Sequence, residues 1–187
     1  MPGSKEGGKI LVYTVGHSNR PIDEFLKLLK RNLVTLVADI RSIPGSGYNP
    51  QYNSVTLAHT LRINGIGYVR LEDLGGYLSP ARESPNDGLG DDHFRAYADY
   101  MLTDAFRRAL EKFLDLARKE TVAAMCSEAF PGRCHRQFFS DALVIRAVEV
   151  QDIYGLFDVR THWLSSLAVV RGDTIIYPKD SHQTHLF

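Results

Sequence analysis

The feature that most constrains the fold is a regular alternation of two patterns along the chain. Short, continuous apolar runs rich in β-branched residues have the length of buried strands, and the segments between them carry apolar residues at helical spacing. We expect strands over residues 9–16, 35–41, 68–76, 121–127 and 149–157, and helices over 21–32, 54–66, 93–120 and 135–148. This alternation predicts a Rossmann-like α/β domain with a mostly parallel sheet and helices on both faces.

Individual residues mark where these elements begin and end. Pro21 is typical of the start of a helix, and Asn19 is a candidate N-cap for it. Gly65 would close the second helix, and Thr103 would cap a new helix where the pattern over 93–120 breaks. Two apolar runs within 167–178 surround a short polar stretch, which predicts a C-terminal β-hairpin.

The length and charge of the chain narrow the classes of function. With 187 residues and no internal repeat or linker, the chain is expected to form one domain over 10–180, after a flexible leader (1–9) and before a short tail (181–187). There are 22 basic and 22 acidic residues. The resulting net charge of zero argues against a protein that coats nucleic acid by bulk charge.

Features that the sequence lacks narrow the classes of function further. There is no apolar run long enough to span a membrane, and the N-terminus lacks the apolar stretch of a signal peptide, so we expect a cytoplasmic protein with reduced cysteines. A glycine-rich phosphate loop is also missing, so we expect no nucleotide cofactor and no other cofactor. The sequence carries no signal for an oligomeric state.

Unusual polar groups follow the ends of four expected strands. In an open α/β sheet the carboxyl ends of parallel strands meet at one edge, where ligands bind at a topological switch point. We therefore expect these groups to form one polar crevice. They are His17, Ser18 and Asn19 after the first strand, Asp39 and Arg41 on the second, Gly75 and Gly76 after the third, and Cys126 and Glu128 after the fourth.

Two carboxylates in this group point to acid–base chemistry. Asp39 and Glu128 could form a pair with separated pKa values, as hydrolytic or glycosidic cleavage requires, and His17 could carry a proton. An alternative stays open for Asp39. It lies two residues from Arg41 on a strand, so the two side chains point the same way and could form a structural ion pair.

The loop after the second strand is dense in amide and phenol groups. It contains Tyr48, Asn49, Gln51 and Asn53. Such groups recognise base edges or sugar hydroxyls, and aromatic rings stack on bases. The alternative is a polar turn built around the Asn-Pro dipeptide.

The stretch that contains both cysteines leaves four interpretations open. Cys126 could be a reactive thiolate whose pKa is lowered by a helix start and by Arg133 or Arg136, which could also hold an anion. Alternatively, Cys126 and Cys134 could form a disulfide in an oxidising setting, or pack in the core as small apolar residues. The fourth interpretation is a zinc site formed by the two cysteines and His135, with His17 as a candidate fourth ligand. The cysteine spacing fits no common structural zinc pattern, so we predict no metal.

The combination and order of these motifs resemble the DUF488 family over about residues 10–178, with the loop 77–92 outside the pattern. The resemblance implies a compact α/β domain in which the motif positions recur. The family is a domain of unknown function, so the resemblance implies no reaction. The motif residues are His17, Ser18, Asn19, Asp39, Arg41, Asn49, Gln51, Asn53, Gly75, Gly76, Cys126, Glu128, Cys134, His135 and Arg136.

Three function hypotheses follow. The first is a hydrolytic or glycosidic enzyme that acts on a nucleotide, nucleobase or nucleic-acid component, with phosphate held by Arg41 and Arg136 and the base or sugar held by the 48–53 loop. The second is a thiol enzyme in which Cys126 attacks the substrate and Cys134 is its resolving or structural partner. The third is a non-catalytic module that binds a nucleotide or nucleic acid in the same crevice.

Overall fold

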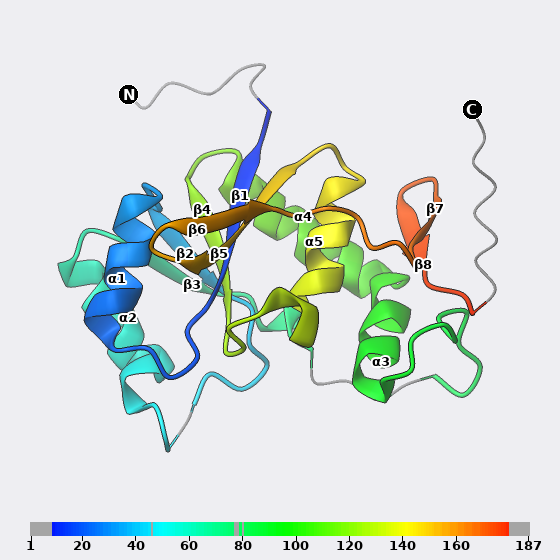
Figure 1. Ribbon diagram of the computed structural model, residues 1–187, viewed down its shortest axis with the longest axis horizontal. Coiled ribbons are helices and arrows are strands. Elements are labelled where there is room, and N and C mark those ends of the chain that lie inside the picture. Colours follow the sequence, from blue (N-terminus) through cyan, green and yellow to red (C-terminus); the bar gives the residue numbers. More distant parts are fainter. Residues whose placement is uncertain (1–8, 46, 77–78, 80, 180–187) are drawn as a thin grey trace.

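The computed structural model describes residues 9–45, 47–76, 79 and 81–179. The predicted tail (181–187) and all but the last residue of the predicted leader (1–9) lie outside the described residues. The described chain forms a single mixed α/β domain that confirms the predicted fold class (Figure 1).

Six strands form the central sheet in the order β3-β2-β4-β1-β5-β6. The first five strands in this sheet are parallel, and β6 is antiparallel to β5. The register places Gly16 beside Cys126 and Asp39 beside Met125. The strands are β1 (Leu11–Gly16), β2 (Leu36–Asp39), β3 (Gly67–Arg70), β4 (Val122–Cys126), β5 (Glu149–Gly155) and β6 (Asp158–Thr161).

Helices cover both faces of the sheet, as predicted. α1 (Ile22–Arg31) and α2 (Ser54–Ile63) lie on one face, and α3 (Asp92–Met101), α4 (Asp104–Ala117) and α5 (Arg136–Val144) lie on the other (Figure 1). The alternation of side chains along β4 separates the two cores: Ala123 and Met125 pack with the first pair of helices, whereas Val122 and Ala124 pack with the other three. All five residues of β4 are buried, which explains its continuous apolar run.

The smaller elements complete the domain. The predicted C-terminal hairpin is present as the antiparallel pair β7 (Val169–Arg171) and β8 (Thr174–Ile176). Single turns of 3₁₀-helix are η1 (Pro50–Tyr52), η2 (Glu72–Leu74) and η3 (Pro131–Arg133). Among the described residues, no helix has the length and apolar character that crossing a membrane requires.

Three local predictions can be compared directly. Thr103 caps α4, because its hydroxyl accepts a hydrogen bond from the backbone N–H of Phe106 at 3.2 Å. Gly65 follows the end of α2 with a φ of 75°, a conformation that suits glycine. The prediction of Asn19 as an N-cap was wrong. The cap position of α1 is occupied by Pro21, which has no side-chain acceptor.

One predicted strand is much longer than the strand in the structure, and one strand was missed. The third strand ends at Arg70 instead of continuing to residue 76, because the chain turns into η2 at Glu72. The edge strand β6 was missed, because three of its four residues are polar and the strand is largely solvent-accessible, so it does not form an apolar run. It pairs back onto β5 as an antiparallel edge.

The two central strands end at the topological switch point of the sheet. From β1 the chain passes through α1 to β2 on one side, and from β4 it passes through α5 to β5 on the other. The segments that follow β1 and β4 stay paired beyond the strands, since the N–H of His17 donates to the carbonyl of Cys126 at 3.0 Å. A side chain at Gly16 would collide with the Glu128 backbone, so only glycine permits this approach. This geometry places the predicted crevice at the switch point.

Candidate functional site

Two adjoining pockets lie at the carboxyl ends of the strands. The first has a volume of about 400 Å³ and the second about 420 Å³, and they share Arg41, Ile43, Ser127 and Glu128 as walls. The first is also lined by Gly76, Cys126, Arg133, Cys134 and His135, and the second by His17, Ser18, Asn19 and Asn49. The structure therefore brings together residues from all four strand ends that the sequence singles out.

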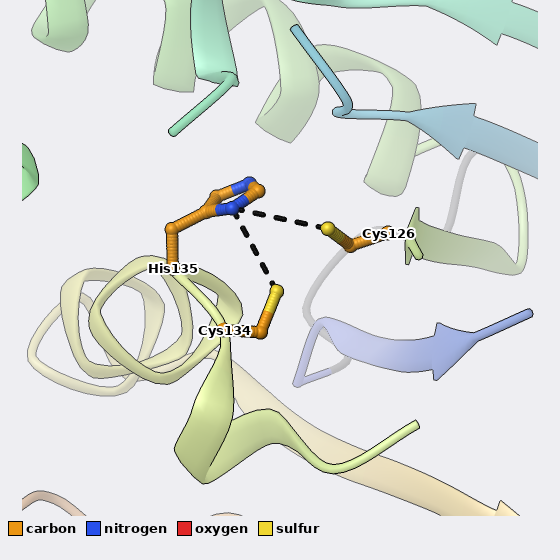
Figure 2. Close-up of side chains that lie close together, drawn as sticks. All are labelled: Cys126, Cys134 and His135. Carbon is orange, nitrogen blue, oxygen red and sulfur yellow. Dashed lines mark hydrogen bonds between the residues drawn. The ribbon is translucent and has the colours of Figure 1, made fainter. Parts of the chain in front are cut away.

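Two cysteines and a histidine form a cluster in the wall of the first pocket (Figure 2). Cys126 ends β4, and Cys134 and His135 lie between η3 and α5. The Nδ1 atom of His135 lies 3.9 Å from the sulfur of Cys126 and 3.7 Å from the sulfur of Cys134. Both cysteines are free thiols, so no disulfide links them.

The two thiols in this cluster have opposite pKa shifts. A hydrogen bond from Cys134, with the nearby His135 and Arg136, holds the pKa of Cys126 well below its usual range, although burial works in the other direction. The same contact with Cys126, together with burial, raises the pKa of Cys134. These opposite shifts favour the thiolate form at Cys126, with Cys134 as its hydrogen-bond donor.

Close packing holds the ring of His135 against the two sulfurs. A Cβ atom at Gly76 would lie 2.7 Å from the Cγ and Nδ1 atoms of this ring, so Gly76 leaves just enough room for it. The Tyr97 ring packs on His135 with a centroid separation of 5.0 Å. The Nε2 atom of His135 is buried and has no hydrogen-bond partner within the described part of the chain.

Asp39 and Arg41 form a buried ion pair, the alternative that the two-residue spacing predicts. The guanidinium Nε donates to Oδ1 of Asp39 at 2.8 Å, and a terminal nitrogen donates to Oδ2 at 2.6 Å. Oδ2 also accepts a hydrogen bond from the hydroxyl of Tyr68, and Oδ1 accepts one from the backbone N–H of Arg41. Because both carboxylate oxygens are engaged and Asp39 is fully buried, this arrangement favours a structural role over that of a general base.

His17 connects this ion pair to the second pocket. Its Nδ1 lies 2.7 Å from the carbonyl oxygen of Ser18 and its Nε2 lies 3.0 Å from the guanidinium of Arg41. Only the Nδ1–H tautomer satisfies both contacts, and burial, with the charge of Arg41, lowers the pKa of His17 and keeps it neutral. His17 thus positions Arg41. The predicted role of His17 as a proton carrier stays a prediction, one that requires a hydrogen bond to break.

Arg136 lies behind the cysteine loop rather than in a pocket. Its side chain is fully buried and donates hydrogen bonds to the carbonyls of Glu128 and Ala129 and to the hydroxyl of Thr14. It therefore fixes the loop between β4 and α5. Arg133, from η3, is exposed and lines the first pocket, so it is the better placed arginine for an anion.

The remaining predicted residues are distributed unevenly around the crevice. Asn49 lines the second pocket, whereas Tyr48 projects almost entirely into solvent. Gln51 donates to the carbonyl of Arg20, and Asn53 lies at the start of α2. Gly75 allows η2 to approach Ser42, since a Cβ there would lie 2.2 Å from the serine hydroxyl.

Sequence reasoning missed the apolar side of the first pocket. Ile43 and Phe94 line it together with His93. Phe94 lies in the first turn of α3, and its ring packs on the ring of Phe138 in α5. The sequence carries no local signal for that contact.

A buried charged network that the sequence did not suggest lies behind the site. His162 contacts Asp141 at 2.9 Å through Nε2 and Asp152 at 3.1 Å through Nδ1. Burial alone would lower the pKa of His162, but its hydrogen bonds to the two carboxylates raise it to about 9. Asp152 also accepts a hydrogen bond from the hydroxyl of Thr14, which in turn accepts one from Arg136. The network thereby supports the arginine that holds the cysteine loop.

Comparison with known proteins confirms the family resemblance, over a shorter stretch than the predicted residues 10–178. The family model described as a domain of unknown function, DUF488, matches residues 21–143. No curated protein and no solved structure matches the chain.

Proposed function

Because the chain belongs to the DUF488 family, a domain of unknown function, its chemistry has to be inferred from its own site, and we propose that it is an enzyme that hydrolyses a nucleotide or a related phosphate-bearing nucleoside. The observation that supports this is the pair of adjoining pockets at the switch point. They combine cationic and amide groups with a cluster of thiol, imidazole and carboxylate groups. Such a combination in one concave site is typical of an active site.

The pocket walls suggest how the substrate lies. Arg133 offers positive charge for a phosphate group, whereas the charge of Arg41, which also lines the pocket, is already paired with Asp39. Ile43 and Phe94 offer an apolar wall for a base ring, and the amides of Asn19 and Asn49 offer donors and acceptors in the second pocket.

Glu128 is the carboxylate available for acid–base catalysis. It lines both pockets, and its exposed position differs from the buried and fully hydrogen-bonded position of Asp39. In a hydrolysis, the oxygen of water bonds to the electrophilic centre while the bond to the leaving group breaks. Glu128 takes the proton from the water and returns it to the leaving group.

Binding and turnover of defined nucleotides test the proposal. The probes are the four ribonucleoside 5′-monophosphates and their nucleosides, with binding followed by saturation-transfer NMR and products by chromatography. We expect Glu128→Gln to bind as wild type does but to turn over about a hundredfold more slowly, and the exposed Glu111→Gln on α4 to behave as wild type. Binding without turnover would support the binding-module hypothesis instead, and the absence of binding would overturn the nucleotide assignment.

A thiol enzyme is the second candidate, because Cys126 lines the first pocket and its pKa is held well below its usual range. In that case Cys126 attacks the electrophilic centre, forms a covalent intermediate and expels the leaving group, and water then releases the enzyme. Alkylation by iodoacetamide, followed by mass spectrometry against pH, tests this candidate. It requires fast labelling of Cys126 near pH 6 that a chelator does not change. Labelling only after unfolding would exclude it.

A further inference from the structure

We propose that Cys126, Cys134 and His135 bind a zinc ion whose fourth coordination position opens into the first pocket. Binding of the ion stands on the geometry of the three side chains. Its use in hydrolysis rests on the function proposed above. Three protein ligands and one open position are the usual arrangement of catalytic zinc, and two cysteines with one histidine are a known ligand set for it.

The separations between the ligand atoms fit one ion. With Zn–S bonds of about 2.3 Å and Zn–N bonds of about 2.0 Å, tetrahedral geometry holds sulfur and nitrogen about 3.5 Å apart. The structure has 3.9 Å and 3.7 Å between Nδ1 of His135 and the two sulfurs, and all three ligand atoms lie within 4.8 Å of one another. For the two nitrogen–sulfur pairs, shifts of a few tenths of an ångström would therefore give the spacing of a tetrahedral site.

The orientation of His135 is a second, independent observation. Its Nδ1 faces two sulfurs at distances long for a strong hydrogen bond, and its Nε2 is buried with no partner among the described residues. A buried imidazole with no strong hydrogen bond is costly to the fold. Coordination of Nδ1 to a cation would replace its two weak sulfur contacts with one strong interaction, and Gly76 leaves room for the ring in this position.

The open position faces the groups that the proposed hydrolysis uses. The three ligands, Glu128 and Arg133 line the same pocket. Zinc lowers the pKa of a bound water toward neutrality, so water at the open position would be the nucleophile and Glu128 would accept its proton. Cysteine sulfur and imidazole nitrogen favour zinc over magnesium or calcium, which prefer oxygen ligands.

Metal analysis of the purified full chain tests the site. We expect about one zinc per chain in the wild type, little in Cys126→Ser, Cys134→Ser and His135→Gln, and the wild-type content in His59→Gln, a variant of an exposed histidine on α2. Metal retained in all three cluster variants, or iron in place of zinc, would overturn the assignment.

A measurement on the wild type guards against variants that fail to fold. After removal of metal with a chelator, cobalt(II) is added and the absorption spectrum recorded. Thiolate-to-cobalt charge-transfer bands and intense tetrahedral d–d bands are expected, whereas the weak spectrum of hydrated cobalt would overturn the proposal. Nucleotide turnover that persists without metal would leave the proposed function standing and overturn the use of zinc in hydrolysis, whereas the metal content and the cobalt spectrum decide whether the ion binds. Bound zinc without nucleotide binding would leave the zinc site standing and overturn the proposed function.

Discussion

Arg41 and Asp39 form a two-point ion pair in which neither side chain has appreciable contact with solvent. The pair sits at the end of β2, and His17 and the carbonyl of Tyr52 take two further N–H groups of the arginine. A charge buried in this way depends on its partner, because removal of one partner leaves the other charge buried without a counter-charge. The pair therefore forms part of the floor of the crevice and also stabilises the fold.

Asp39→Asn is expected to destabilise the protein by about 3–5 kcal/mol, because it leaves the buried guanidinium of Arg41 without a counter-charge. Urea unfolding followed by circular dichroism measures this loss.

The exposed pair Arg160 and Asp158 on β6 offers a matched control. It has the same two-residue spacing and the same two-point geometry, with distances of 2.7 Å and 2.8 Å. Asp158→Asn is expected to change stability little, because solvent screens an exposed pair. If Asp39→Asn left stability unchanged and abolished turnover, Asp39 would be a catalytic base rather than a structural anion.

The buried histidine of the second network predicts a pH dependence of stability. Because its folded pKa of about 9 lies above the unfolded value of 6.5, His162 contributes stability that is fully present below pH 6.5 and is lost as pH rises through 9. At about 1.4 kcal/mol per pKa unit the loss is about 3 kcal/mol. Urea unfolding at pH 6, 7.5 and 9.5 measures it.

Two variants isolate the contribution of this histidine. His162→Gln is expected to be less stable and to lose this part of the pH dependence, whereas His59→Gln is expected to keep the wild-type slope. If His162→Gln does not fold, NMR titration of the wild-type imidazole gives the pKa directly. An apparent pKa near 6.5 would contradict the prediction.

The parts of the fold that the sequence predicted are those with a local cause. The apolar run of β4 could be recognised because the whole strand is buried between two helical layers, and the cap by Thr103 depends on contacts three residues apart. The edge strand β6 could not be recognised in the same way. Its pairing with β5 depends on backbone hydrogen bonds, to which side-chain hydrophobicity gives no guide.

The position of the site in the fold could be predicted from the sequence, but the roles of the individual residues could not. Parallel strand ends meet at one edge whatever their sequence, so the convergence of Arg41 and Cys126 followed from topology. Arg136 and Arg133 look equivalent along the chain, and only burial separates the arginine that holds the loop from the one that faces the pocket. Likewise, His162 lies far from Asp141 in sequence, so no spacing rule could have found their contact.

Arg133→Gln is expected to weaken binding of nucleoside monophosphates about tenfold, or by about 1.4 kcal/mol, and to leave binding of the nucleosides unchanged. The reason is that an arginine in the pocket wall interacts with the phosphate charge and not with the base. Titration by NMR at two salt concentrations measures both affinities, and the difference between variant and wild type should shrink at high salt. Arg62→Gln, an exposed arginine on α2, is the control. Equal weakening for nucleosides and nucleotides would mean that Arg133 does not contact the phosphate.

Gly76→Ala is expected to weaken zinc binding at least about tenfold while the fold stays intact, because a ligand that is misoriented by its surroundings binds metal poorly. The added Cβ would lie 2.7 Å from the imidazole of His135, so the ring must turn away from the two sulfurs. Competition with a chromophoric chelator measures the affinity, and thermal unfolding of the metal-free protein checks the fold. Gly132→Ala lies in the same cysteine loop with no atom within 4 Å of the new Cβ, so it should bind zinc as wild type does. If Gly76→Ala kept the wild-type affinity, the position of the His135 ring against Gly76 would not be the one that binds the ion.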